Sequence, residues 1–358
     1  MNKFFRKLLL WPLATVYALV VSIRHRMYDS GTLKSRSFDV PTLCVGNLRV
    51  GGTGKTPMTD YLVGKLKKQY KVAVLSRGYK RRTNGFVLAS ADSTTRQIGD
   101  EPKLIKNLHP DVMVAVCEDR AHGIEKIMAA DPSVSLIILD DAFQHRAVQP
   151  TVSILLSECG KLYMHDSVMP VGHLRDLKSR AAKADIIAVT KCPPDAKPID
   201  LRLIYREMNM KVYQRLVFMT LRSDPPVSLT DRSEAAKGAK IAVTTAIASS
   251  GNFVGGLEKN YEVVRKFIYK DHYNYTKNDI LHMFRQMGKD EILVCTAKDA
   301  VKIEELGLTE DILARIYVVH IKFEVLPYQQ ALNDIEFISV IKQKLNGTYR
   351  SNSPIYKP

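Results

Sequence analysis

The chain has 358 residues, of which 46% are hydrophobic and 25% charged, with a formal net charge of +16 at pH 7. This composition is ordinary for a globular protein and excludes a mostly disordered chain, and the length suggests two domains or one domain with a large insertion. The positive charge indicates an anionic partner such as nucleic acid, an acidic membrane or a phosphorylated substrate, but does not choose among them.

The first 30 residues combine an apolar run with basic residues on both sides. Residues 8–23 are largely apolar, and Arg24, His25 and Arg26 follow them. A signal peptide would end in a small-residue cleavage site, which is missing here. At 1.5 Å per residue such a run covers about 24 Å, less than the roughly 30 Å of a hydrocarbon core. We therefore expect a membrane-associated helix over residues 1–30, with a buried helix of the soluble fold as the alternative.

The cysteines are odd in number and scattered, and they lack paired metal-ligand spacing. They are Cys44, Cys117, Cys159, Cys192 and Cys295. We expect reduced core residues of a cytosolic protein rather than disulfides or a zinc site.

Short runs rich in Val, Ile and Leu recur along the first part of the chain, separated by segments of helical periodicity. The runs are 41–46, 71–76, 111–117, 135–140, 152–157 and 185–190. Apolar runs without alternation are typical of parallel strands that are covered on both faces. We therefore expect an α/β fold, with a doubly wound, mostly parallel sheet in residues 31–222.

Prolines, serines and aspartates cluster around residues 191–200 and 222–238, as they do in loops and linkers. Further apolar runs follow at 240–248, 261–269 and 291–297. We expect them to form a second, smaller α/β domain over residues 223–322. Residues 323–358 would return to the first domain, completing a strand that starts near residue 315 and adding a helix, and end in a loose tail.

A glycine-rich loop follows the first apolar run. Residues 45–56 read VGNLRVGGTGKT and precede a helical segment. In such a loop, backbone N–H groups approach phosphate oxygens, the lysine neutralises the β and γ phosphates, and the Thr hydroxyl reaches Mg²⁺. The sequence therefore predicts a P-loop that binds a nucleoside triphosphate through Gly51, Gly52, Thr53, Gly54, Lys55 and Thr56.

The loop departs from the pattern G-x-x-x-x-G-K-[ST], because Arg49 stands where the first glycine belongs. It is similar instead to the G-G-x-G-K-T variant of the signal-recognition and partition-ATPase branch. Partition ATPases carry a signature lysine just before the two glycines, and Val50 occupies that position here. A membrane-associated partition-type ATPase switch is the alternative function that the loop leaves open.

A strand that ends in acidic residues is the second part of a P-loop site. The segment SLIILDDAFQHR places Asp140 and Asp141 at the end of an apolar run, where an acid faces the phosphate-bound Mg²⁺. Guanine specificity would need an N/T-K-x-D segment, and the candidate VTKCP has Pro193 in place of the Asp. The sequence therefore favours ATP.

Phosphoryl transfer also needs a group that orients the attacking oxygen and accepts its proton. IGDEPKLI offers Asp100 and Glu101, and YKDHYNYTKND offers Asp271 and His272. Asp100 could instead be a helix N-cap, and His272 could be a loop residue ahead of a T-x-x-D cap. Spacing in the sequence does not bring the two segments together.

Further segments follow one another in a fixed order along the chain: VGNLRVGGTGKTP, LSRGY, GDEP, DR at 119–120, LDDAFQHR, MPVGHLRD, DIIAVTK, KDHYNYT and TAKDAVK. This ordered set resembles the tetraacyldisaccharide 4′-kinases, the lipid A kinases of Gram-negative bacteria. The resemblance extends from the N-terminal helix to about residue 305. It implies transfer of the γ-phosphate of ATP to the 4′-hydroxyl of a tetraacyl glucosamine disaccharide 1-phosphate, giving lipid IVA at the cytoplasmic face of the inner membrane.

The resemblance also implies catalytic roles by motif position. Asp100 would act as the base on the sugar hydroxyl. His272, with Asp271 beside it, would assist from the second domain, and Lys55 would carry the phosphates.

Metal and substrate contacts follow from the same resemblance. Thr56, Asp140 and Asp141 would serve Mg²⁺, with Glu101 near the metal. Three further side chains would line the cleft toward nucleotide or lipid phosphate: Arg77, Tyr79 and Arg120. The chain departs from the family pattern at Tyr273, where a second histidine is usual, and at Ala297, where a glutamate is usual.

An anionic lipid substrate and the inner-membrane surface would together account for the positive charge. The basic segment YKRR at 79–82 could meet the 1-phosphate or lipid headgroups, or could be a solvated charge run. Aromatic residues are sparse in the basic stretches, so we do not expect nucleic-acid binding. We expect a monomer.

Overall fold

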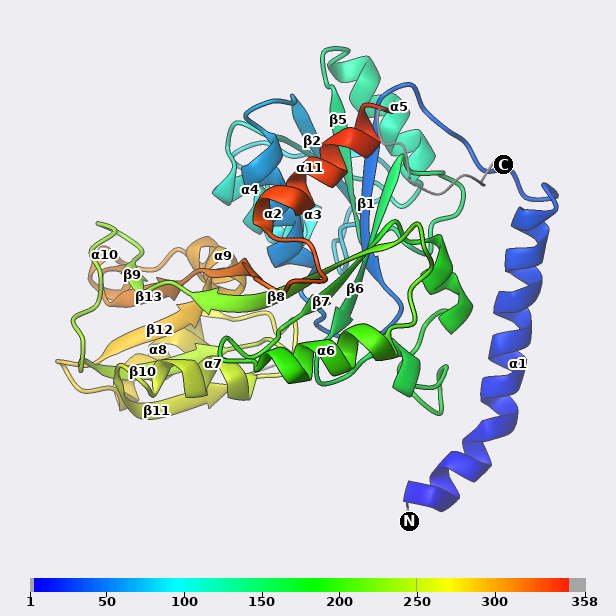
Figure 1. The fold of residues 1–358 in the computed structure, drawn as a ribbon. Coiled ribbons are helices and arrows are strands. Elements are labelled where there is room, and N and C mark those ends of the chain that lie inside the picture. Colours follow the sequence, from blue (N-terminus) through cyan, green and yellow to red (C-terminus); the bar gives the residue numbers. More distant parts are fainter. Residues whose placement is uncertain (1–2, 249, 348–358) are drawn as a thin grey trace.

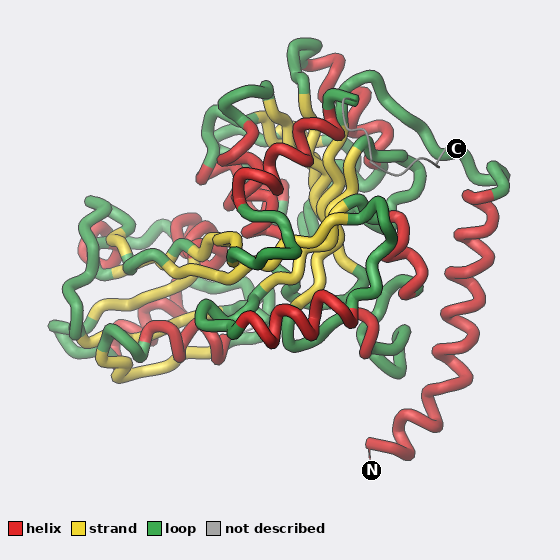
Figure 2. The backbone as a smooth tube through the Cα atoms, in the orientation of Figure 1, coloured by secondary structure: helices red, strands yellow, loops and turns green. Residues whose placement is uncertain are grey.

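The structure is a computed structural model that describes residues 3–248 and 250–347. The predicted loose tail beyond residue 347 lies outside the described residues. Two sheets organise the chain, and Figures 1 and 2 show them side by side with their strands running in different directions.

The first sheet has the strand order β14-β8-β7-β6-β1-β5-β2-β4-β3. Its parallel strands are β1 (Thr42–Asn47), β2 (Val72–Ser76), β4 (Met113–Val116), β5 (Leu136–Asp140), β6 (Val152–Glu158), β7 (Ile186–Thr190) and β8 (Arg215–Ser223). The short β3 (Val87–Leu88) and β14 (Ile321–Leu326) pair antiparallel at the two edges. The six apolar runs of the first domain are therefore confirmed as strands of a mostly parallel sheet.

Helices cover both faces of this sheet, as a doubly wound fold requires. One face is covered by α2 (Lys55–Leu66), α4 (Asp100–Leu108) and α11 (Asp334–Leu345), and the other by α5 (Arg120–Ala130) and α6 (Pro198–Glu207). Short helical turns complete this part of the chain: α3 (Thr95–Ile98), η1 (Tyr163–His165) and η2 (Lys178–Lys183). The central strands are buried along their whole length because both faces are covered.

The second sheet has the order β11-β10-β12-β13-β9. Its strands are β9 (Val227–Ser228), β10 (Lys240–Thr245), β11 (Glu262–Ile268), β12 (Ile292–Thr296) and β13 (Ile316–Val319). The helices around it are α7 (Ser250–Leu257), α8 (Lys277–Gln286), α9 (Ala297–Ile303), η3 (Glu304–Leu306) and α10 (Glu310–Leu313). This sheet has its own apolar clusters on both faces, so it forms a second α/β unit.

The segment around residues 315–323 forms two strands where the sequence suggests one. β13 pairs with β12 in the second sheet, and β14 then pairs with β8 in the first. A continuous apolar run cannot distinguish one strand from two strands joined by a bend. The chain therefore returns to the first sheet through β14 and α11, whose Phe337 and Ile341 are fully buried.

Helix α1 (Lys3–Asp29) stands at the side of the first sheet, with its N-terminal end directed away from the body (Figure 1). Its inner face contacts the body through Tyr17 and His25, whose side chains reach Arg175 and Asp176. Its outer face carries large apolar side chains, and Trp11 is 64% exposed. Among the described residues, we find no helix with the length and hydropathy needed to cross a membrane.

Candidate active site

The glycine-rich loop joins β1 to α2 and depends on glycine at two points. Gly51 and Gly54 have φ angles of 105° and 94°, a backbone region that side chains disfavour. A Cβ atom on Gly54 would also lie 2.5 Å from the ring of Phe323 in β14. Gly54 is the residue before the first turn of α2, so the N-terminus of that helix faces the loop.

Two polar contacts fix the centre of this loop. The side-chain amide of Asn47 donates to Oγ1 of Thr53 at 2.6 Å, and Oγ1 of Thr190 donates to the Thr53 carbonyl at 2.8 Å. Asn47 ends β1 and Thr190 ends β7, so the ends of two strands hold the loop.

The predicted lysine and acidic pair meet at this loop. β1 and β5 are parallel neighbours, which brings Asp140 beside Val45. Asp141 follows with a φ of 49°, which directs its carboxylate toward Lys55, and Nζ of Lys55 lies 3.8 Å from Oδ2 of Asp141. The phosphate loop and the acidic strand end therefore form one site, as the sequence predicts.

Negative charge is concentrated around Asp140 and Asp141, as expected at a cation-binding site. Burial raises the pKa of Asp140 to about 6, and the negative charges of Glu101 and Asp141 add to the rise. Asp140 accepts from Thr59 at 3.1 Å and from Ser76 at 3.4 Å, two contacts that sequence reasoning missed. Thr56, the predicted hydroxyl ligand, lies half-buried at the start of α2.

The residues present fit Mg²⁺. In the part of the chain that the structure describes, no three His, Cys, Asp or Glu side chains form a ready-made metal cage. Mg²⁺ usually binds through one or two carboxylates together with substrate phosphates and water, so a complete protein cage is not required.

The acceptor candidates from the two domains come together. Oδ2 of Asp100, at the start of α4, lies 2.8 Å from Nδ1 of His272, in the loop after β11. His272 has a φ of 58°, and its ring packs edge-on against Tyr79 at a centroid distance of 5.2 Å. Asp271 lies at the rim, with Oδ1 3.9 Å from Nε2 of His272.

Two lysines of α9 complete this cluster, and sequence reasoning gave them no role. Nζ of Lys298 lies 3.1 Å from Glu101 and 3.8 Å from Asp100, and Nζ of Lys302 lies 3.4 Å from Asp100. The usable signal was their spacing of four within TAKDAVK, which places both on one helix face.

The groups around Asp100 lower the pKa of its carboxyl. Burial alone would raise the pKa of this carboxyl, but the hydrogen bond from His272 and the charges of Lys298 and Lys302 outweigh burial. The pKa of Asp100 consequently lies well below its usual range. Asp100 is also the first residue of α4, with Gly99 as the N-cap, so its side chain is not the helix cap that spacing alone suggested.

The three predicted cleft residues have different surroundings. Tyr79 is 57% exposed and Arg77 is exposed near the acidic strand end. Arg120 is only 1% exposed, and its guanidinium donates to the backbone carbonyls of Cys117 and Asp140. Arg120 therefore supports the strand end from within the protein, which differs from the expected position in an open cleft.

The departures at Tyr273 and Ala297 leave the cluster intact. Tyr273 stacks on Tyr269 at 4.4 Å, and its carbonyl accepts a hydrogen bond from Lys302. Ala297 begins α9 and packs in the core of the second sheet. The T-x-x-D cap after His272 is also present, with Thr276 and Asp279 forming a capping box at α8.

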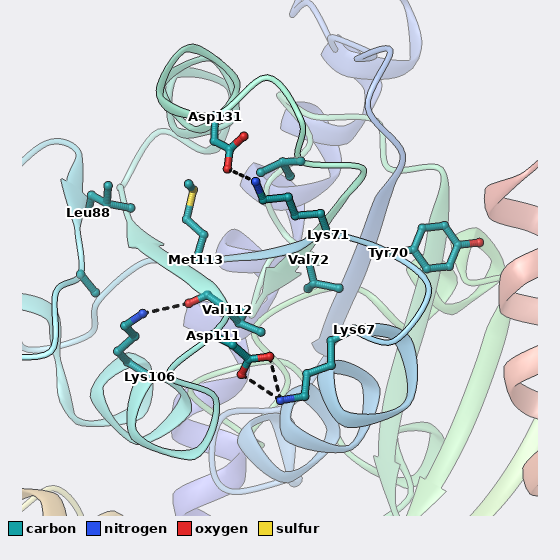
Figure 3. A pocket seen from close by; sticks show the side chains of 12 residues that line it. Lys67, Tyr70, Lys71, Val72, Leu88, Lys106, Asp111, Val112, Met113 and Asp131 are labelled. Atoms are coloured by element: carbon teal, nitrogen blue, oxygen red, sulfur yellow. Dashed lines mark hydrogen bonds and ion pairs between the residues drawn. The ribbon is translucent and has the colours of Figure 1, made fainter.

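A hollow of about 390 Å³ lies at the opposite end of the first sheet, where β2 and β4 begin (Figure 3). Four of its charged residues form ion pairs, Lys67 with Asp111 at 2.9 Å and Lys71 with Asp131 at 2.6 Å, and Nζ of Lys106 donates to the carbonyl of Pro110 at 2.8 Å. Ligands of open α/β sheets bind at the carboxyl ends of the strands, so this hollow is not the catalytic site.

The match to known proteins agrees with this geometry. A family model described as tetraacyldisaccharide-1-P 4′-kinase matches residues 6–338. The chain belongs to this family. A tetraacyldisaccharide 4′-kinase of Bacteroides thetaiotaomicron is 38% identical over 95% of this chain and 94% of the relative. One from Cytophaga hutchinsonii is also 38% identical, over 93% of this chain and 95% of its own.

A solved structure of the family has the same fold. It is LpxK from Aquifex aeolicus in complex with ATP, with a TM-score of 0.74 and 26% identity over 95% of this chain and 99% of that one. Membership of the tetraacyldisaccharide 4′-kinase family confirms the resemblance drawn from the motifs. It identifies the chain as a lipid A 4′-kinase and sets aside the partition-type switch.

Proposed function

We propose that the protein transfers the γ-phosphate of ATP to the 4′-hydroxyl of a tetraacyl glucosamine disaccharide 1-phosphate with His272 as proton acceptor and Asp100 as its positioning partner. The observation that carries this assignment is the 2.8 Å contact between His272 and Asp100. The second domain reaches the phosphate loop as well, because a Cβ on Gly52 would lie 3.6 Å from Ala248.

The contacts of His272 define which nitrogen can accept a proton. Nε2 lies 3.2 Å from Nζ of Lys298, and an ammonium group only donates. Nε2 is therefore the lone-pair nitrogen, and Nδ1 carries the hydrogen that is donated to Asp100. A sugar hydroxyl that replaces Lys298 at Nε2 would meet a base held in the correct tautomer.

The alternative assignment of Asp100 as the base is less favourable. Its pKa lies below the usual range, so its carboxylate binds a proton weakly. Its oxygens are also occupied, since Oδ1 accepts from the backbone of Glu101 at 3.0 Å and Oδ2 faces His272 and Lys302. We therefore assign Asp100 the role of orienting His272, which reverses the order implied by motif position.

The glycine-rich loop and the acidic residues at the end of β5 would bind the triphosphate and Mg²⁺. Backbone groups from Gly51 to Gly54 and the ammonium of Lys55 would hold the triphosphate of ATP. Thr56, Asp140 and Asp141 would hold Mg²⁺, which when bound neutralises charge on the β and γ phosphates. Glu101 would lie near the metal, where it is already held by Lys298.

Helix α1 would seat the protein at the cytoplasmic face of the inner membrane. Its exposed apolar side chains are Leu9, Trp11, Leu13, Val16, Leu19, Val20, Ile23 and Met27. Burying one such side chain contributes roughly 1.5–3 kcal/mol, so several suffice for peripheral attachment. Arg77 and Tyr79 would then contact phosphate groups of the lipid, whose acyl chains stay in the leaflet.

The transfer assay tests this proposal. Purified protein in detergent micelles receives ATP, Mg²⁺ and the disaccharide 1-phosphate, and the lipid product is analysed by mass spectrometry. We expect a bisphosphorylated lipid. ATP hydrolysis without a phosphorylated lipid would contradict the assignment and favour a nucleotide-driven switch.

A further inference from the structure

We propose that Arg175 is a positioning residue of the phosphate site and that helix α1 holds Arg175 in place. The inference rests on the phosphoryl transfer proposed above. Arg175 lies between η1 and η2, in the MPVGHLRD segment, for which the sequence suggested no chemistry.

The side chain of Arg175 binds the carboxylate of Asp141, the residue that follows β5. Nη1 lies 3.1 Å from Oδ2 of Asp141, Nη2 contacts the other oxygen, and Nη2 also donates to Oδ1 of Asn47 at 2.5 Å. The planar guanidinium suits a carboxylate bound through both oxygens, which fixes orientation as well as distance. Asp141 is thus held between Arg175 and Lys55, and the pKa of Asp141 is lowered: burial opposes this, and both cations outweigh it.

The backbone of the same segment pairs with the phosphate loop. The N–H of Arg175 donates to the carbonyl of Leu48 at 2.8 Å, and the N–H of Val50 donates to the carbonyl of His173 at 2.9 Å. Arg49 and Leu174 form the antiparallel bridge between these bonds. A displacement of the segment would therefore move the loop and Asp141 together.

Helix α1 holds this segment from the other side. Oη of Tyr17 donates to the carbonyl of Arg175 at 2.8 Å. Nε2 of His25 lies 2.6 Å from Oδ1 of Asp176, and these two side chains are buried, with the residues 6% and 1% exposed. Tyr17 and His25 are separated by about two helical turns, so they lie on one face of α1.

Arg146, five residues after Asp141, also contacts this helix. Nη1 of Arg146 donates to the carbonyl of His25 at 2.8 Å, and Nη2 lies 2.6 Å from Asp29. The exposed apolar side chains of α1 take no part in these polar contacts. The inner face of α1 is therefore part of the scaffold of the phosphate site, in addition to the outer face that would meet the membrane.

Tyr17→Phe tests the inference because it removes one hydroxyl and leaves the outer face unchanged. We expect kcat for transfer to fall about 3- to 10-fold, the loss of one hydrogen bond, with KM for the lipid unchanged. Binding to vesicles of mixed zwitterionic and anionic phospholipid should stay at the level of the unmodified protein. Hydrogen exchange of residues 173–177, measured without nucleotide or Mg²⁺, should become faster.

Tyr28→Phe is the matched control on the same helix. The Tyr28 ring packs against Arg24 and Arg146, and these contacts do not use the hydroxyl. We expect unchanged kcat and unchanged exchange of residues 173–177 in this variant.

Arg175→Lys tests the other end of the chain of contacts. This variant keeps the positive charge but loses the bidentate contact with Asp141. We therefore expect kcat to fall about 10- to 100-fold, and the nucleotide affinity measured without Mg²⁺ should also change. Because α1 acts through Arg175, the double variant with Tyr17→Phe should be no slower than Arg175→Lys alone.

Two results would overturn the inference. One is a Tyr17→Phe protein with normal kcat and normal exchange of residues 173–177. The other is a loss of activity in Tyr17→Phe that disappears at saturating vesicle concentration. That result would mean that α1 serves only to attach the protein to the membrane. Failure of the proposed transfer itself looks different, since the unmodified protein would then yield no phosphorylated lipid.

Discussion

Nδ1 of His272 lies 2.8 Å from Oδ2 of Asp100, although 172 positions separate the two residues in the sequence. The contact joins the loop after β11 to the start of α4, and Nζ of Lys298 and of Lys302 lie 3.8 Å and 3.4 Å from the same Asp100 oxygen. In the proposed mechanism this carboxylate fixes the tautomer of the base, as the aspartate does in the Ser-His-Asp triad.

Replacement of His272 should therefore abolish most of the chemistry while sparing nucleotide binding. We expect His272→Gln to lower kcat by about 10²- to 10⁴-fold, the usual contribution of a positioned general base. The KM for ATP should change little, because the phosphate loop is untouched. Steady-state transfer kinetics check this expectation.

His282→Gln provides the control for that variant. His282 is an exposed residue of α8 in the same domain, and its side chain contacts Gln286 rather than the acceptor cluster. A similar loss of kcat in His282→Gln would mean that the second domain is sensitive to histidine replacement in general.

Local sequence patterns predict the phosphate half of this site, whereas the acceptor half followed only from the resemblance to a known family. The loop and the acidic strand end follow from local patterns, because parallel neighbours bring the ends of β1 and β5 to the same sheet edge. The meeting of Asp100 with His272 depends on how two sheets pack, which periodicity and spacing do not encode.

Burial is the other property that motif position left undetermined. The family resemblance placed Arg120 in the cleft, facing nucleotide or lipid phosphate. In the structure this side chain is buried, and its two Nη atoms donate to the backbone carbonyls of Cys117, just after β4, and Asp140, at the end of β5. The arginine that contacts the Asp141 carboxylate is instead Arg175.

Asp140 should make the stability of the metal-free protein depend on pH. Its pKa is raised to about 6 by burial and neighbouring negative charges, so protonation favours the folded state. The resulting stability is present below the unfolded pKa of 3.8 and is lost as pH rises through about 6. Asp140→Asn should therefore raise the melting temperature by about 2–6 °C at pH 7.5 and by much less at pH 4.5.

Calorimetry with and without Mg²⁺ checks this expectation. Equal effects of Asp140→Asn at both pH values would contradict a raised pKa. The same variant should lose the stabilisation that Mg²⁺ and nucleotide together confer on the unmodified protein.

The conformation of Gly54 should be indispensable for the phosphate loop. Gly54→Ala places a Cβ in a left-handed region and 2.5 Å from Phe323, so we expect weaker ATP binding and a loss of stability of about 1–3 kcal/mol. Gly64→Ala is the matched control, because Gly64 lies within α2 with no atom within 4 Å of the added methyl group. This control should gain roughly 0.5–1 kcal/mol and bind ATP normally.

Calorimetric titration with ATP distinguishes the two glycines. Normal ATP affinity of Gly54→Ala would show that the loop tolerates another conformation at this point. A large loss in Gly64→Ala would instead indicate that α2 itself is fragile.

The outer face of α1 should control membrane binding. We expect the double variant Trp11→Gln, Leu13→Gln to bind phospholipid vesicles less tightly, with a higher KM for the lipid and an unchanged kcat at saturating vesicle concentration. Ile335→Gln is the control, because Ile335 is an equally apolar side chain that is 81% exposed on α11. Vesicle flotation checks both, and equal flotation of the double variant and the unmodified protein would exclude this face of α1.

A double-mutant cycle on single-turnover transfer tests the central claim most directly. The rate of γ-phosphate transfer to the lipid is measured at saturating ATP for Asp100→Asn, His272→Gln and the protein with both changes. If Asp100 acts by orienting His272, the double variant should be no slower than His272→Gln alone. Losses that multiply, or a near-normal rate in either single variant, would contradict a paired base.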